Sequence, residues 1–149
     1  MKTIALAMCL LMLSGCAALQ ERIAKLNVKK GSYNSFVAPE ITASDSVIIT
    51  KGMAKFLGGQ MAYAKTTLEL EPVQNPFHAQ LRDQLRGMGF GVVETVIPNQ
   101  DAVPIRYYVS PLETGVLVRM NYLGKSANLF FSRTPSGLSI NTYAMRGSK

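Results

Sequence analysis

The first apolar stripe after the N-terminal region follows helical spacing and predicts a helix over residues 45–57. Ser44 or Asp45 can cap its first turn, and Gly58-Gly59 end the pattern. The apolar positions of this helix are Ile49, Met53, Phe56 and Leu57.

Polar and apolar residues then alternate from Ala64 to Glu71, which predicts a half-buried strand that Pro72 ends. We expect Glu69 and Glu71 to face water beside Lys65 and not to form a catalytic carboxylate pair. The opposite face of this strand carries Ala64, Thr66, Leu68 and Leu70.

A second helix is predicted where Asn75 can cap and Pro76 occupies the first helical position. Gly87 or Gly89 ends this helix, and residues 90–97 continue as a strand. The glycines of "GMGFG" follow a helix and open a strand, the reverse of a phosphate-binding loop, so they indicate a helix stop and a tight return. The apolar stripe of the second helix is Phe77, Leu81, Leu85 and Met88.

From Ile105 onward the chain reads as four strands, "IRYYVS", "VLVRMNYL", "NLFFSR" and "LSINTYAM", separated by "PLETG", "GKSA" and "TPSG". Each separator carries Gly or Pro in a turn-compatible place, and Pro135 suits the second position of a type I turn. The pattern therefore predicts an α+β fold, with two helices interleaved with strands and followed by a C-terminal antiparallel meander.

The N-terminus has the order of a secretory signal: Lys2, an apolar run, then small residues. The run from Ile4 to Leu13 would form a helix of about 15 Å, roughly half of the hydrocarbon core of a bilayer. We therefore do not expect it to be a permanent membrane span.

The series Leu13-Ser14-Gly15-Cys16 resembles the lipobox of bacterial lipoproteins. That resemblance implies that residues 1–15 are removed as a signal peptide and that Cys16 carries acyl chains, palmitate among them, which anchor the protein. It also implies the outer membrane, facing the periplasm, because Ala17 stands where an Asp would favour the inner membrane. A plain secreted protein with a coincidental cysteine is the alternative.

Residues 16–43 are predicted to be a lipidated tether, ahead of a globular domain at 44–149. Leu19, Ile23 and Leu26 stand at i, i+4 and i+7, which is typical of a short amphipathic segment that docks on a partner. A wholly disordered linker between lipid and domain is the open alternative.

The formal net charge of +7 favours anionic partners such as phospholipid head groups or nucleic acid. The charge is scattered along the sequence, however, and neither a basic face interleaved with aromatic residues nor a reading module is evident. We therefore expect no direct nucleic-acid binding. The densest basic cluster lies just after the proposed anchor and contains Arg22, Lys25, Lys29 and Lys30.

His78 is the single histidine, and we expect it to have a surface or capping role. It has no second histidine or nearby thiol with which to form a metal set. One histidine and no nucleophile-elbow motif give a hydrolase little support. We expect no enzymatic activity, no cofactor and no metal.

The order of "TTL", "PFHAQLRDQLRGMGFGVV" and "IRYYVSPLETGVLVRMNYLG" after a lipobox resembles the TrbH family of conjugal-transfer lipoproteins. The resemblance implies a lipoprotein subunit of a type IV secretion outer-membrane core complex. It also implies a domain similar to the small α+β domain at the N-terminus of secretins, which packs into rings. The chain departs from the family pattern at its end, because it has no tryptophan and finishes "INTYAMRGSK".

These observations favour a structural, non-enzymatic lipoprotein of a conjugation or secretion channel. Cys16 would attach it, Leu19, Ile23 and Leu26 would dock on other core-complex subunits, and sheet edges would make the contacts of a homo-oligomeric ring. The alternative is a stand-alone periplasmic lipoprotein that binds an envelope component such as a glycan or a lipid.

Overall fold

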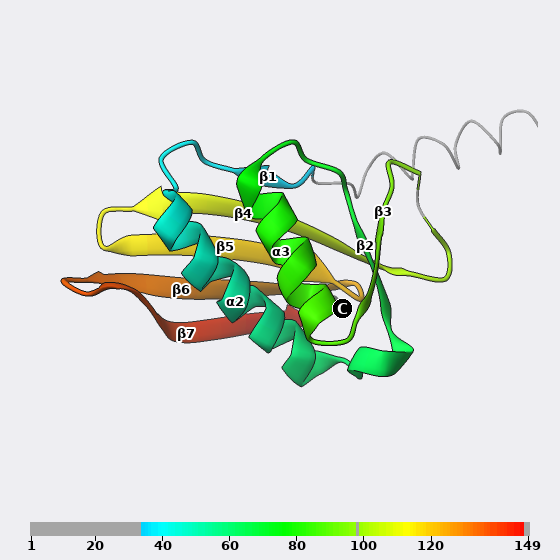
Figure 1. The fold of residues 1–149 in the computed structure, drawn as a ribbon. Coiled ribbons are helices and arrows are strands. Elements are labelled where there is room, and N and C mark those ends of the chain that lie inside the picture. Colours follow the sequence, from blue (N-terminus) through cyan, green and yellow to red (C-terminus); the bar gives the residue numbers. More distant parts are fainter. Residues whose placement is uncertain (1–33, 98, 148–149) are drawn as a thin grey trace, which may run out of the picture. The chain divides into compact units, whose positions relative to one another are not determined.

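Two α-helices lie on one face of a mixed β-sheet in the computed structural model, which describes residues 34–97 and 99–147 (Figure 1). This arrangement confirms the predicted α+β fold class. The elements are β1 (Phe36–Val37), α2 (Ala43–Gln60), the 3-10 turn η1 (Tyr63–Lys65), β2 (Thr67–Leu70), α3 (Pro76–Gly87), β3 (Gly91–Glu94), β4 (Val103–Leu112), β5 (Gly115–Tyr122), β6 (Lys125–Thr134) and β7 (Gly137–Gly147).

The sheet combines a parallel part with the predicted antiparallel meander. Its strand order is β3-β2-β4-β5-β6-β7, and β1 pairs with β4 beside this path. Strand β2 is parallel to both β3 and β4, whereas β4 to β7 are antiparallel neighbours in sequence order. Helix α3 connects β2 to the parallel strand β3, which is the usual way to join adjacent parallel strands.

Helix α3 follows the sequence prediction at both ends. The side chain of Asn75 accepts a hydrogen bond from the His78 amide at 2.8 Å, and Pro76 occupies the first turn. The helix ends at Gly87, and Gly89 has a φ of +95°, a conformation that a side chain would strain. The glycines of this return therefore stop the helix and reverse the chain.

Helix α2 is longer than the predicted 45–57. Thr42 caps it, with its hydroxyl accepting from the Asp45 amide at 3.1 Å, and the helix continues to Gln60. Gly58 therefore lies inside the helix and does not end it. Its missing side chain leaves room for the Tyr63 ring of η1, which a Cβ at this position would approach to 2.5 Å.

The predicted strands before and after α3 are shorter than the alternation suggested. Residues 63–65 form the turn η1, so β2 keeps only Thr67–Leu70, and β3 spans Gly91–Glu94 instead of 90–97. The remaining residues, 95–102, form the loop that carries the chain from β3 across to β4.

The compact unit begins at Asn34, so the boundary predicted at residue 44 lies inside it. Strand β1 pairs in parallel with β4, and the Ala38 amide donates to the Val109 carbonyl at 3.0 Å. Backbone pairing thus incorporates a segment that the sequence pattern assigned to the tether. The signal peptide and the rest of the tether lie outside the described residues.

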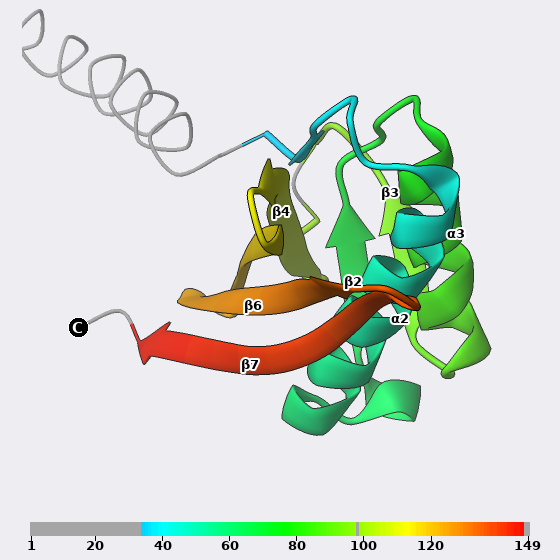
Figure 2. The ribbon, with the colours of Figure 1, turned by 90° about the vertical axis from the view of Figure 1, so that its left-hand side faces the viewer.

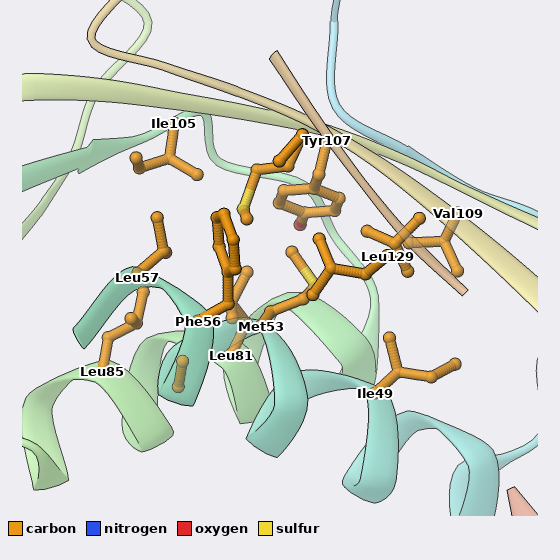
Figure 3. Close-up of a cluster of buried hydrophobic side chains, with 14 of the residues drawn as sticks. Ile49, Met53, Phe56, Leu57, Leu81, Leu85, Ile105, Tyr107, Val109 and Leu129 are labelled. Atoms are coloured by element: carbon orange, nitrogen blue, oxygen red, sulfur yellow. The ribbon is translucent and has the colours of Figure 1, made fainter. Parts of the chain in front are cut away.

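The core fills the space between the helices and the sheet (Figure 3). Side chains from α2 and α3 point toward β4 and β6, and all of those named here are buried. Burial of this kind contributes about 1.5 to 3 kcal/mol for each large apolar side chain. The residues are Ile49, Met53, Leu57, Leu81, Leu85, Ile105, Val109 and Leu129.

Candidate functional site

His78 lies in a buried polar network between α3 and the sheet, and the expectation of a surface role was wrong. Its residue surface is 3 % exposed. The ring Nδ1 is 3.1 Å from the Tyr107 hydroxyl of β4, and Nε2 is 2.7 Å from Glu94 Oε1 of β3. The imidazole therefore connects three elements that are separate in the sequence.

The Tyr107 hydroxyl and the Glu94 carboxylate determine which hydrogen bonds the two nitrogens of the His78 ring make. An ionised carboxylate can only accept, so Nε2 carries the proton and donates to Glu94. Burial raises the pKa of Tyr107, and the charges of Glu71 and Glu94 raise it further, so its hydroxyl stays protonated. Tyr107 can then donate to Nδ1, which satisfies both ring nitrogens.

Glu94 extends this network to the protein surface. Its second oxygen, Oε2, accepts from Arg82 Nη1 at 3.4 Å. Partial burial acts to raise the pKa of Glu94, but the hydrogen bonds from His78 and Arg82 and the charge of Arg82 outweigh it and lower that pKa. Glu94 is therefore held as a carboxylate at the rim of the network.

Glu69 is buried as well, contrary to the prediction that it faces water with Glu71. It is 1 % exposed, and its Oε1 accepts from Arg106 Nη2 at 2.6 Å. Its Oε2 accepts from the Asn99 amide, also at 2.6 Å. The loop of residues 95–102 therefore covers the side of β2 that carries Glu69, and the ion pair fastens that loop.

Glu71 holds the beginning of the described chain. Its Oε2 accepts from the Ser35 amide at 2.9 Å, and the Ser35 hydroxyl accepts from the Tyr107 amide at 3.4 Å. Glu71 is half-buried, whereas the sequence pattern predicted that it faces water. Its role is to fix the chain immediately before β1.

Each of these titratable groups is thus bound to a partner on another element. Such closed pairs stabilise a particular arrangement of strands and helices, whereas a general acid or base must be accessible to a substrate. Within residues 34–97 and 99–147, no group of three His, Cys, Asp or Glu side chains could hold a metal ion. The polar network is therefore best explained as structural.

The sheet face opposite the helices is a second candidate site. Figures 1 and 2 show α2 and α3 together on one side of the sheet, and no other described element covers its far side along β4 to β6. Phe36 and Tyr108 stack there, with ring centroids 5.0 Å apart and planes at 25°. Strand register places Arg119 and Asn128 beside them.

Sequence reasoning missed this surface, although it left one signal. In "IRYYVS" strict alternation sends Tyr107 to the core and Tyr108 to the opposite face. The contribution of Phe36 had no local signal, because it depends on the pairing of β1 with β4.

The site residues predicted near the N-terminus, Cys16, Leu19, Ile23 and Leu26, lie outside the described residues. Among the helices that are described, none combines the length and the apolar composition of a membrane span.

Comparison with known protein families places the chain in one of them. No curated protein and no solved structure matches the chain. The family model described as conjugal transfer protein TrbH matches residues 27–147, which includes the domain from β1 to β7. The chain therefore belongs to the TrbH family of conjugal transfer proteins.

Proposed function

We propose that this conjugal transfer protein is a structural lipoprotein subunit of a type IV secretion core complex, anchored in the outer membrane and facing the periplasm. Membership of the TrbH family supports a place in the transfer apparatus. The lipobox series ending at Cys16 supports the anchor. Leu19, Ile23 and Leu26 would dock on a neighbouring subunit of the complex.

The observation that carries the assembly role is the edge of the sheet at β7. This strand runs over Gly137–Gly147 and, among the described strands, pairs only with β6. The outer side of an edge strand presents unpaired amide and carbonyl groups, which are a template for pairing with another chain. A second copy or another subunit can add a strand there, as in β-augmentation.

The closed polar network supports a structural role in a different way. His78, Glu94 and Tyr107 fix α3 against two strands, and Glu69 and Arg106 fix the loop between β3 and β4. A subunit that repeats around a ring needs a rigid domain, so that each contact surface has the same geometry in every copy.

Site-specific crosslinking in cells that carry the transfer system tests the assembly role. A photoreactive residue in place of Ser139, exposed on β7, is expected to crosslink to a second copy or to another transfer subunit. The matched control is the same residue at Lys51, exposed on α2, which should crosslink little. Equal crosslinking from both positions would contradict assembly through the β7 edge.

Metabolic labelling tests the anchor independently. Labelled palmitate should enter the wild-type protein and not the Cys16→Ser variant, because the thiol is the acceptor that the lipobox implies. Incorporation into Cys16→Ser would refute the lipoprotein assignment. A wild-type protein that is acylated but always sediments as a single subunit would instead favour a stand-alone periplasmic lipoprotein.

A further inference from the structure

One row of residues crosses the uncovered face of the sheet. Phe36 on β1 is the register partner of Tyr108 on β4, which is in turn the partner of Arg119 on β5. Arg119 is paired with Asn128 on β6. Because register partners lie on the same face of a sheet, these four side chains form a line about 14 Å long, three strand spacings.

The two aromatic rings of this row are unusually exposed for a stacked pair. Phe36 is 43 % exposed and Tyr108 is 47 % exposed, although the rings contact each other. A folded domain normally buries aromatic rings, which contribute most when they are removed from water. Flat π surfaces left at the sheet surface are therefore suited to a ligand that stacks.

The polar half of the row is available to a ligand. Arg119 and Asn128 are exposed, and neither has a hydrogen bond or an ion pair with a side chain of the described residues. By contrast, Arg106 in the next row is engaged by Glu69. The free guanidinium and amide can thus contact a phosphate and the edge of a base.

The charge of the C-terminal third of the chain favours an anionic partner. From residue 102 onward the sequence has a single acidic residue, Glu113, which lies in the turn between β4 and β5 and not on the open face. A net positive segment attracts polyanions, and the carboxylates on and just after β2 are already engaged, Glu69 by Arg106 and Glu71 by the Ser35 amide. The basic residues of the same segment are Arg106, Arg119, Lys125, Arg133, Arg146 and Lys149.

We propose that this row, Phe36, Tyr108, Arg119 and Asn128, binds single-stranded nucleic acid. Bases would stack on the aromatic pair, while Arg119 contacts a phosphate and Asn128 the edge of a base. Stacking platforms on open sheets combined with arginine are the usual chemistry of single-strand recognition. The proposal goes beyond the structural role proposed above and does not depend on it.

This inference departs from the sequence-based expectation of no nucleic-acid binding. That expectation rested on the scatter of basic residues along the chain. Strand pairing changes the picture, because it makes Phe36, Tyr108 and Arg119, which come from three different segments, register neighbours on one face of the sheet. An acidic peptide would use Arg119 but does not need two stacked flat rings, and a lipid surface would favour aliphatic side chains ringed by several cations.

Fluorescence anisotropy with a labelled oligothymidylate tests the proposal, with the full-length protein solubilised in detergent. We expect binding at low salt that Tyr108→Ala weakens by at least about fivefold, the lower end for loss of one stacked base. Tyr108→Phe should retain the affinity because stacking needs only the ring. Arg119→Ala should weaken binding and also reduce its salt dependence.

Matched controls separate this site from general electrostatic attraction. Tyr63→Ala removes a tyrosine that is 42 % exposed near α2, and Lys51→Ala removes an exposed cation on α2. Both should leave the Kd within about twofold, while melting temperatures identify any unfolded variant. The proposal is overturned if the oligothymidylate does not bind, if the controls weaken binding as much as Tyr108→Ala does, or if Tyr108→Ala lowers affinity only for anionic vesicles.

Discussion

The imidazole of His78 donates from Nε2 to the Oε1 atom of Glu94 across 2.7 Å and thereby ties helix α3 to strand β3. These two elements are consecutive in the chain. They are joined by the backbone of the Gly87–Gly91 return and, in addition, by this side-chain hydrogen bond. The opposite nitrogen of the same ring faces Tyr107 on β4 at 3.1 Å. One side chain therefore sets how α3 lies over the parallel part of the sheet.

Replacing His78 by Ala should destabilise the domain by about 1 to 3 kcal/mol, the cost of leaving a buried polar group unsatisfied. The group left without a partner is the hydroxyl of Tyr107, which is buried under α3. Urea unfolding followed by circular dichroism measures the change. The control is Asp83→Ala on the exposed side of the same helix, expected within about 0.5 kcal/mol. If the two variants unfold at the same urea concentration, the network does not stabilise the fold.

The pH dependence of stability should reveal Glu94. Its pKa in the folded protein is lowered from its ordinary 4.5, so ionised Glu94 stabilises the fold at neutral pH. This contribution is complete above the unfolded pKa and is lost as pH falls through the lower, folded value. The difference in unfolding free energy between wild type and Glu94→Gln should therefore shrink as the pH falls below about 4.5. A difference that grows on acidification would contradict the assigned hydrogen bonds.

How much of this network could be predicted from the sequence depends on the range of each interaction. Asn75 and Pro76 mark the start of α3 by local chemistry, and both were predicted correctly. The burial of His78 was not predicted. Helix α3 packs against both α2 and the sheet, so the buried side of this helix is wider than the stripe that contains Leu81 and Leu85. The partners that satisfy His78 come from β3 and β4, and no local pattern indicates them.

The strand that carries Glu69 shows the same limit. Alternation correctly predicted that Leu68 and Leu70 share the buried face of this strand. It could not predict that the loop of residues 95–102 crosses β2 and covers the other face, where Asn99 and Arg106 bind the carboxylate. The antiparallel meander was predictable because its strands and turns are consecutive, whereas the parallel pairing of β1 joins residues 36 and 108.

Gly115→Ala should destabilise the protein by at least about 1 to 3 kcal/mol, the range for overpacking. Gly115 opens β5 opposite Ser132, and a Cβ at this position would overlap the carbonyl oxygen of Phe131. The backbone of two central strands would have to separate. Gly59→Ala is the matched control, because its Cβ would meet nothing within 4 Å and α2 gains up to about 1 kcal/mol in helix propensity. Thermal unfolding should move the two variants in opposite directions, and similar melting temperatures would show that the strands can adjust.

The segment between the proposed anchor and β1 should become ordered only against a partner. Leu19, Ile23 and Leu26 would share one side of a helix, yet isolated helices under about 12 to 15 residues are marginal in water. An apolar stripe of this length gains stability only when a partner buries it, so we expect it to order on another subunit.

The segment lies ahead of Ser35 and Phe36, which the domain already holds through Glu71 and β4, so changes in it should leave the domain folded. Replacing the three residues together by Ser should therefore preserve palmitate labelling and the melting temperature, and yet remove the protein from a large detergent-resistant complex in sedimentation of solubilised membranes. The matched control replaces Gln20, Arg22 and Lys25, three of the four polar residues between them, by Ser and should sediment like the wild type. If the apolar variant still sediments with the complex at wild-type levels, the segment is a spacer and assembly must depend on the domain, with the β7 edge as the first surface to test.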